Sequence, residues 1–241
     1  MKSNFILPRK NSQCGSTGMI QLDKFRFFTR GLMSFVKFQG GLLLLVFGFS
    51  LYLTFNVQAG EPVLGKPAPG FTLMGADGKG HSLSDYKGSF IVLEWFNPDC
   101  PFVKKHYNSK NMQKLQKYYR EKGVIWMIVN SSAKGKQGYC TTERANEVIK
   151  DNDMVPTAFL LDHDGKVGRL YGAKTTPHMY VIDKDGLLIY HGAIDNKPST
   201  RIKDIKDAEN YVRAALDEAI AGKSVSVKAS QPYGCSVKYA Y

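Results

Sequence analysis

Cys100 is the residue whose type and setting point most directly to chemistry. It lies in the segment Asn-Pro-Asp-Cys-Pro-Phe-Val-Lys-Lys-His, residues 97–106, between an apolar run and a stretch with helical spacing. Pro101 suits the first position of a helix, because the N–H that proline lacks would have no intrahelical partner there. Cys100 is therefore expected at a helix N-terminus, where free backbone N–H groups and the helix dipole favour an anion. We predict a thiolate with a lowered pKa, the nucleophilic form of cysteine.

Glu94 is a second candidate, because it is the one acid inside the apolar run Phe-Ile-Val-Leu-Glu-Trp-Phe, residues 90–96. A carboxyl group buried in such a strand should have a raised pKa and could transfer protons near neutral pH. The alternative is an acid at a strand edge that pairs with a lysine.

The elements that would position these residues alternate between strand and helix. Five segments are expected to be strands: 90–96, 124–129, 157–161, 178–183 and 187–191. Three segments are expected to be helices: 104–121, 141–150 and 202–221. The last two strands flank the sequence Lys-Asp-Gly, which is typical of a hairpin turn. This order predicts an α/β fold, a three-layer sandwich in which a central mixed β-sheet is flanked by helices.

The order strand, cysteine, proline, helix resembles the thioredoxin superfamily. Residues 61–240 resemble its exported redoxins, the peroxiredoxin-like proteins related to AhpC/TSA. Thioredoxins carry a Cys-x-x-Cys motif, in which Cys100 matches the first cysteine and Val103 replaces the second. Glu94 matches the buried acid that thioredoxins use in proton transfer. The resemblance implies a thioredoxin-like fold and a thiol oxidoreductase with a single active-site cysteine, without cycling through an adjacent dithiol.

Thr176-Pro177 matches the cis-proline turn of the same superfamily, which lies beside the active cysteine and presents its backbone to an extended substrate. Cis X–Pro bonds are uncommon enough to mark a special turn, and an ordinary trans-proline at a strand start is the alternative. Residues 232–239 resemble the tail of this redoxin subgroup. Peroxiredoxins have Pro and then Thr or Ser where Leu93 and Asn97 stand, so the resemblance does not imply a standard peroxidase mechanism.

The remaining cysteines offer partners for Cys100. Outside the N-terminal region the chain has Cys100, Cys140 and Cys235, an odd number that leaves at least one thiol unpaired or exchanging in an oxidising compartment. Cys235 is the preferred resolving or disulfide partner, Cys140 is the second candidate, and no stable bond is the third outcome. Sequence separation does not decide, because a disulfide needs Cα atoms within about 7 Å. Lys104 and Lys105 could stabilise a thiolate, although a solvated helix face is expected for at least one of them.

Copper(I) binding is the alternative from another functional class. Cys100, His106, His178 and Met179 are the soft or intermediate ligands that copper(I) accepts. Exported copper carriers of thioredoxin fold resemble one another in a Cys-x-x-x-Cys motif plus a distant histidine, and here Lys104 stands at the second cysteine position. The main expectation is therefore an enzyme without metal or cofactor, and Cys100 with His178 is the alternative metal pair.

The N-terminal region has the order of an export signal. Residues 38–60 contain no charge, basic residues precede them, and Val-Gln-Ala at residues 57–59 provides small residues for cleavage. We expect a signal peptide cleaved after Ala59, with a retained signal anchor as the alternative. Met33 is a better start for such a leader than Met1. The expected organisation is a leader over residues 1–59 and a redoxin domain with a cysteine-containing tail over residues 60–241.

Composition excludes several functional classes. A 43% hydrophobic content excludes a mainly disordered chain, and glycine without a three-residue period excludes collagen. Half of the net charge of +12 lies in residues 1–59, and no Lys/Arg stripe with interleaved aromatics follows, so nucleic acid is not an expected partner. We expect an exported, periplasmic or extracytoplasmic, thiol oxidoreductase that acts on protein or small-molecule thiols and disulfides, with peroxides as a neighbouring substrate class. Only an uncleaved leader would bind the membrane.

Overall fold

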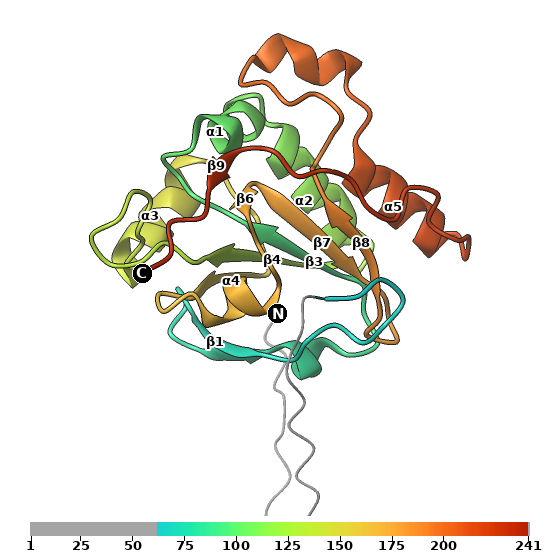
Figure 1. The fold of residues 1–241 in the computed structure, drawn as a ribbon, viewed down its shortest axis with the longest axis horizontal. Coiled ribbons are helices and arrows are strands. Elements are labelled where there is room, and N and C mark those ends of the chain that lie inside the picture. Colours follow the sequence, from blue (N-terminus) through green and yellow to red (C-terminus); the bar gives the residue numbers. More distant parts are fainter. Residues whose placement is uncertain (1–61, 241) are drawn as a thin grey trace, which may run out of the picture. The chain divides into compact units, whose positions relative to one another are not determined.

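The computed structural model describes residues 62–240, which are built around a mixed β-sheet of seven strands (Figure 1). The predicted leader, the Ala59 cleavage site and the start at Met33 lie outside the described residues. No helix within residues 62–240 is long and apolar enough to cross a membrane.

The central sheet has the strand order β2-β1-β5-β4-β3-β7-β8. Its strands are β1 (Thr72–Gly75), β2 (Gly80–Ser82), β3 (Ile91–Trp95), β4 (Ile125–Asn130), β5 (Ala158–Leu161), β7 (His178–Ile182) and β8 (Leu188–Gly192). The strands β3, β4 and β5 are parallel, whereas the pairs β3–β7, β7–β8, β1–β5 and β1–β2 are antiparallel. A separate two-stranded sheet joins β6 (Thr175–Thr176) to β9 (Cys235–Ser236).

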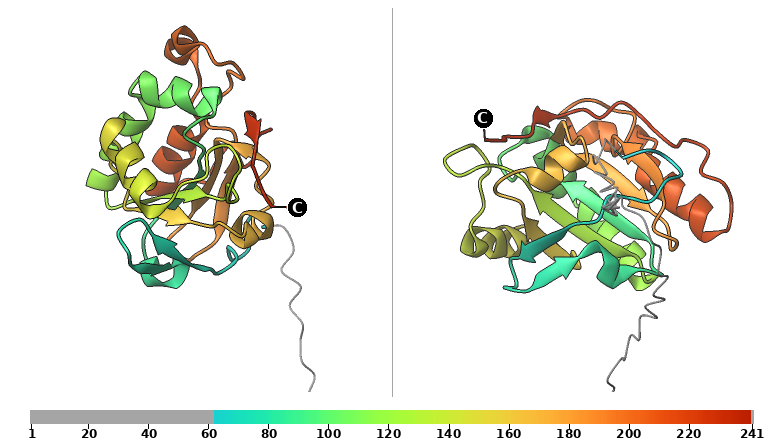
Figure 2. Two further views of the ribbon diagram at one scale, coloured as in Figure 1. Left: turned by 90° about the vertical axis from the view of Figure 1, so that its left-hand side faces the viewer. Right: turned by 60° about the horizontal axis from the view of Figure 1, so that its bottom comes forward.

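Helices cover both faces of the central sheet. They are α1 (Pro101–Asn108), α2 (Asn111–Glu121), α3 (Thr142–Asp151), α4 (Lys166–Leu170) and α5 (Tyr211–Ile220), with 3₁₀ turns η1 (Leu83–Tyr86) and η2 (Ile202–Asp207). The helices α1, α2, α3 and α5 contribute to one buried cluster, and α4 and η1 contribute to the other (Figure 2). The predicted three-layer sandwich with a central mixed sheet is therefore confirmed.

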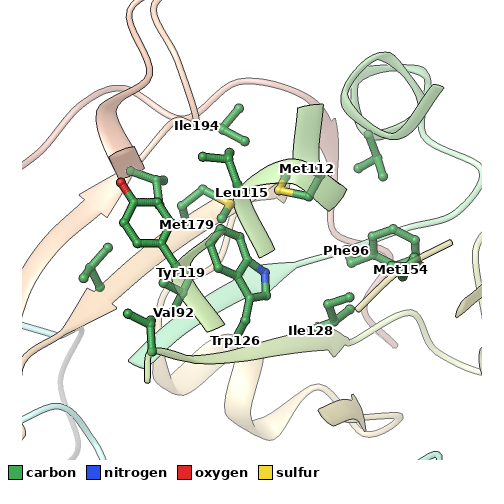
Figure 3. Close-up of a cluster of buried hydrophobic side chains, with 14 of the residues drawn as sticks. Val92, Phe96, Met112, Leu115, Tyr119, Trp126, Ile128, Met154, Met179 and Ile194 are labelled. Atoms are coloured by element: carbon green, nitrogen blue, oxygen red, sulfur yellow. The ribbon is translucent and has the colours of Figure 1, made fainter. Parts of the chain in front are cut away.

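The strand β3 leads from the core to the Cys100 loop, and it is buried on both faces, as predicted. Val92 and Phe96 face the cluster formed with α1 and α2, whereas Leu93 and Trp95 face the opposite cluster. This alternation follows from the two-residue period of a strand. Figure 3 shows the first cluster, in which Trp126 of β4 lies among side chains of α2 and β7. A rigid strand packed on both sides fixes the point where the Cys100 loop begins.

Two predicted helices are each divided in the structure. The segment predicted as one helix over 104–121 breaks at Lys110, which has a left-handed φ of 58°. Tyr107 and Met112 are both buried in the same cluster although they are five residues apart. A continuous helix would place residues at that spacing on different faces, so the break is what lets both side chains reach the core. The predicted helix 202–221 becomes η2 and α5, because the Asn210 side chain caps α5 by accepting from the Arg213 N–H at 2.8 Å.

Candidate active site

Cys100 is the N-cap residue of α1, and Pro101 follows at the first helical position, as the sequence predicts. The strand β3 ends at Trp95, so the chain needs only four intervening residues to carry Cys100 from the sheet to the helix start. The Cys100 side chain is completely buried. Its thiol donates a hydrogen bond to the backbone carbonyl of Thr176 at 3.1 Å.

The Thr176-Pro177 peptide bond is cis, as the sequence resemblance implies. Thr176 lies in β6, directly opposite Cys235 of β9, so this short antiparallel pair brings Cys235 to the turn that Cys100 contacts. The side chains of Cys100 and Cys235 interact electrostatically, and both are free thiols in this structure. Three segments far apart in the sequence therefore meet at one pair of sulfur atoms.

The two thiols have opposite pKa shifts. Burial alone would raise the pKa of Cys100, but hydrogen bonds from Cys235, Thr176 and the backbone N–H of Val103 outweigh it and lower the pKa. Burial, followed by the interaction with Cys100, raises the pKa of Cys235 to about 11. The helix N-terminus thus favours negative charge on Cys100, while Cys235 keeps its proton and donates it. The pair is arranged as one nucleophile and one proton-bearing thiol.

Glu94 is fully buried in the centre of the sheet, which excludes the alternative of an exposed edge acid. Its carboxylate accepts hydrogen bonds from the Tyr107 hydroxyl at 2.8 Å, the Trp126 indole at 2.9 Å and the Gln116 amide at 3.4 Å. Burial raises the pKa of Glu94 to about 7, although these three donors oppose the shift. Cys100 is not among its hydrogen-bond partners in the described chain, and Glu94 reaches α1 through Tyr107.

Cys140 lies outside this thiol pair. Its side chain is completely buried, and its thiol contacts the carbonyl of Gly138 at 3.5 Å. Burial raises the pKa of Cys140 to about 11, so the thiolate is disfavoured there. The structure gives Cys140 the properties of a packed core thiol rather than those of a nucleophile.

The loop before Cys100 is held by residues that the sequence analysis did not single out as functional. The Asn97 side chain is buried and accepts a hydrogen bond from the Asp99 N–H at 2.8 Å. Arg144 of α3 binds both carboxylate oxygens of Asp99 at 3.0 Å. Gly138 has a φ of 78°, and a Cβ atom there would lie 2.1 Å from the Asn97 side chain. This packing fixes the approach to the helix start.

A largely buried polar cluster beside α1 was also not predicted from the sequence. It consists of Lys105, His106, Asp195 and Tyr233, and we call it the Asp195 cluster. The Tyr233 hydroxyl donates to Asp195 Oδ1, and Lys105 Nζ lies 3.2 Å from the Tyr233 oxygen and 3.7 Å from Asp195 Oδ2. Burial lowers the pKa of His106 to about 4 and also lowers the pKa of Lys105. The cluster ties α1 to the segment that carries Cys235.

The structure gives no support to the alternative copper(I) pair. His178 aligns with Trp95 in the β3–β7 pairing, so it faces the cluster opposite the one that includes Cys100. Its ring packs against Tyr180 at 4.6 Å between centroids. Met179 is a buried core residue. Within residues 62–240, no group of three or more His, Cys, Asp or Glu side chains is placed to hold a metal ion.

The tail approaches the cis-proline turn closely. Gly234 has a φ of 141°, a backbone conformation that favours glycine. A Cβ atom at this position would lie 2.1 Å from the carbonyl oxygen of Thr176. Only glycine therefore allows β9 to lie against β6 with Cys235 over the active-site turn.

Comparisons with known proteins agree with this architecture. The sequence model of the AhpC/TSA family matches residues 64–191, which is more than half of the chain. The chain is 29% identical over 143 residues to "Thiol-disulfide oxidoreductase ResA" of Bacillus thuringiensis, an alignment that covers 59% of this chain and 76% of that relative. It is 25% identical over 175 residues to "Thioredoxin-like protein YneN" of Bacillus subtilis, covering 70% of this chain and 98% of the relative.

A solved structure has the same fold over most of this chain. An uncharacterised conserved protein from Geobacillus kaustophilus superposes with a TM-score of 0.63 at 30% identity, covering 74% of this chain and 93% of that one. The strand–cysteine–helix geometry, the cis-proline turn and these similarities lead to one conclusion. The chain belongs to the AhpC/TSA family, and it is an oxidoreductase with a thioredoxin-like fold.

Proposed function

We propose that this protein is an exported thiol–disulfide oxidoreductase in which Cys100 is the nucleophile and Cys235 is the resolving thiol. One observation carries the proposal: Cys100 at the start of α1 contacts the carbonyl of Thr176, and Thr176 pairs directly with Cys235 in the β6–β9 sheet. The opposite pKa shifts of the two thiols support the same assignment. The relatives named as thiol-disulfide oxidoreductases support the same reaction class.

The first step is attack of the Cys100 thiolate on one sulfur of a substrate disulfide. The substrate S–S bond breaks, one half leaves as a thiolate, and the other half remains on Cys100 as a mixed disulfide. Pro101 fixes the helix start that stabilises the attacking thiolate, and the backbone of Thr176 and Pro177 holds the substrate beside it.

The second step resolves the mixed disulfide. Cys235 gives up its proton and attacks the Cys100 sulfur, which releases the second half of the substrate as a thiol. The substrate disulfide is thereby reduced to two thiols, and the protein is oxidised to a Cys100–Cys235 disulfide. Two external thiols then restore the dithiol form and are themselves oxidised to a disulfide. Glu94, with a pKa of about 7, is the group we assign to proton exchange in this step.

The position of Asn97 favours disulfides over peroxides as the substrate of Cys100. This residue stands where peroxiredoxins have a hydroxyl side chain, and both ends of its amide are already engaged. Its oxygen accepts from the Asp99 N–H, and its nitrogen donates to the Gln137 carbonyl at 3.3 Å. The amide is therefore committed to holding the loop rather than to binding a peroxide.

Export is part of the proposal and rests on the uncharged segment 38–60 and the small residues that end at Ala59. The leader covers residues 1–59 and the enzyme domain covers residues 60–241. We propose a periplasmic or other extracytoplasmic location, with protein or small-molecule disulfides as partners and membrane contact only through an uncleaved leader. No cofactor is needed for this exchange.

The test uses Cys235→Ser, which removes the resolving thiol and leaves Cys100 in place. After incubation with oxidised glutathione and acid quenching, the variant should retain glutathione on Cys100, because nothing displaces it. The parent protein should instead show the Cys100–Cys235 disulfide. Peptide mass spectrometry of alkylated samples distinguishes the two products. A stable glutathione adduct in the parent would refute the role of Cys235, and an unmodified Cys100 in both proteins would refute the nucleophile.

A further inference from the structure

We infer that a cavity beside His178 is a binding site for a small oxyanion, such as a carboxylate or phosphate group. We call it the His178 cavity. It has a volume of about 170 Å³. The site is separate from the thiol pair, because His178 lies on the face of the sheet opposite the cluster that includes Cys100. Residues that line the cavity include Tyr171, Lys174, His178, Tyr180, His191 and Gln231.

The walls of the His178 cavity are held by main-chain pairing. Tyr180 of β7 lies directly opposite His191 of β8, and His178 is two residues before Tyr180, so the three side chains share one face of the sheet. The tail closes the cavity from the edge of β8. There the His191 N–H donates to the Lys228 carbonyl at 3.1 Å, and the Ser230 N–H donates to the His191 carbonyl at 3.2 Å. The fold therefore forms this cavity without a ligand.

His178 carries a buried hydrogen-bond donor that lacks a partner. The residue is 3% exposed, and its Nδ1 accepts from the backbone N–H of Lys174 at 3.3 Å. The Tyr180 hydroxyl is 3.2 Å from the same Nδ1 and donates to the Tyr171 carbonyl at 2.7 Å. Burial, followed by the charges of His191 and Lys174, lowers the pKa of His178 to about 3. The ring is therefore neutral near pH 7, with its proton on Nε2. In the described part of the chain, Nε2 has no hydrogen-bond partner.

The size of the cavity fits a small polyatomic acceptor for this donor. A buried N–H that stays unpaired destabilises the fold, because it loses the hydrogen bond that it makes with water in the unfolded chain. The volume of about 170 Å³ exceeds the ~30 Å³ that one water molecule occupies in the liquid. The cavity therefore has room for a carboxylate or phosphate group, which brings several acceptor oxygens at once.

The charges around the cavity favour an anion over a neutral acceptor. Lys174, His178 and His191 are basic, and no Asp or Glu lines the cavity within the part of the chain that the structure describes. An ammonium group and an N–H donor that face the same oxyanion form charge-assisted hydrogen bonds, which are stronger than neutral ones. Lys174 and Gln231 are exposed, so an ion can enter from solvent at this rim.

The experiment follows the histidine side chains by nuclear magnetic resonance in protein that carries isotope-labelled histidine. The probes are phosphate, acetate and acetamide, added at pH 7 with the ionic strength held constant by sodium chloride. Acetamide matches acetate in size and keeps its carbonyl oxygen, so this pair isolates the effect of charge. The signal of the His178 Nε2–H is assigned by its loss in His178→Asn. Asparagine keeps an acceptor near the position of Nδ1 and has no atom at the position of Nε2.

Phosphate and acetate should each move the His178 Nε2–H signal downfield with saturation, and acetamide should leave it in place. Lys174→Gln should weaken the binding of both anions about fivefold. Lys150→Gln, which removes an exposed charge at the end of α3, is the matched control and should bind like the parent protein. His178→Asn should bind at least about tenfold more weakly, because the donor is lost.

Two results would overturn the inference. A His178 signal that stays in place with both anions in the parent protein would exclude the site. Equal shifts with acetate and acetamide, or equal anion affinity in Lys174→Gln and Lys150→Gln, would show that the cavity does not select an anion. The lysine variants change exposed side chains only, so they decide the question even if His178→Asn does not fold.

Discussion

Cys100→Ser is expected to abolish disulfide reduction, with a rate at least about a thousandfold below that of the parent protein. A serine hydroxyl is not ionised near neutral pH, so the nucleophile that the helix N-terminus stabilises is lost. The variant should fold normally, because serine is close to cysteine in size and can donate to the Thr176 carbonyl as the thiol does. Reduction of a fluorescent disulfide substrate measures the rate, and circular dichroism checks the fold.

The matched control is Cys140→Ala, which removes the other completely buried thiol. It should retain disulfide reduction at close to the parent rate, because Cys140 packs in the core and its thiolate is disfavoured. If the two variants lost activity equally, the distinction between a reactive and a structural cysteine would be wrong.

Glu94→Gln is expected to change the pH dependence of stability by about 3 kcal/mol. Burial raises the pKa of Glu94 from 4.5 to about 7, so the folded protein binds its proton more tightly than the unfolded chain does. The stabilising contribution is complete below pH 4.5 and is lost as the pH rises through 7. A shift of this size corresponds to about 3 kcal/mol at ~1.4 kcal/mol per pH unit.

Urea unfolding at pH 5 and pH 8 under reducing conditions provides the measurement. The parent should lose stability between these two pH values, and Glu94→Gln should lose about 3 kcal/mol less. Glu147→Gln, an exposed acid on α3, is the control and should follow the parent. Equal pH dependence of Glu94→Gln and the parent would show that the Glu94 carboxyl is not held protonated in the fold.

The same variant tests the proton role that we propose for Glu94. Its rate of mixed-disulfide resolution should fall about a hundredfold, the lower range for loss of a general acid or base. The inflection near pH 7 in the parent pH–rate profile should disappear with it. Loss of rate with the inflection retained would instead indicate that Glu94 acts only by packing.

The sequence predicted the parts of the site that depend on local pattern. The apolar run over residues 90–96 indicates where the buried strand ends. Cys100 and Pro101 follow that run closely, so their position at the start of the next helix could be predicted. The burial of Glu94 was predicted in the same way, from its place among seven mostly apolar residues, and the structure excludes the alternative of an acid at a strand edge. The sequence pattern within one segment was enough to predict those parts of the site that are formed by residues close together in the chain.

The parts that were missed depend on pairing between distant segments. Lys105 occupies a position in a basic stretch that is typical of a solvated helix face, yet Asp195 and Tyr233 bury it. Those partners lie 90 and 128 residues away along the chain. The spacing of residues within a single segment does not predict these contacts of Lys105. The helix α4 was missed for a different reason, since five residues including Gly168 give too little periodicity to recognise.

The independence of the two-stranded sheet has a consequence for how this protein can diversify. The seven-stranded sheet is complete at residue 192, and α5 ends at residue 220, so the main core closes upstream of Cys235. A substitution at Cys235 alone therefore alters the proposed redox cycle at little cost to folding. A descendant without Cys235 would keep its nucleophile and borrow a resolving thiol from another molecule. The number of cysteines in the cycle is thus an inherited trait that can change without rebuilding the domain.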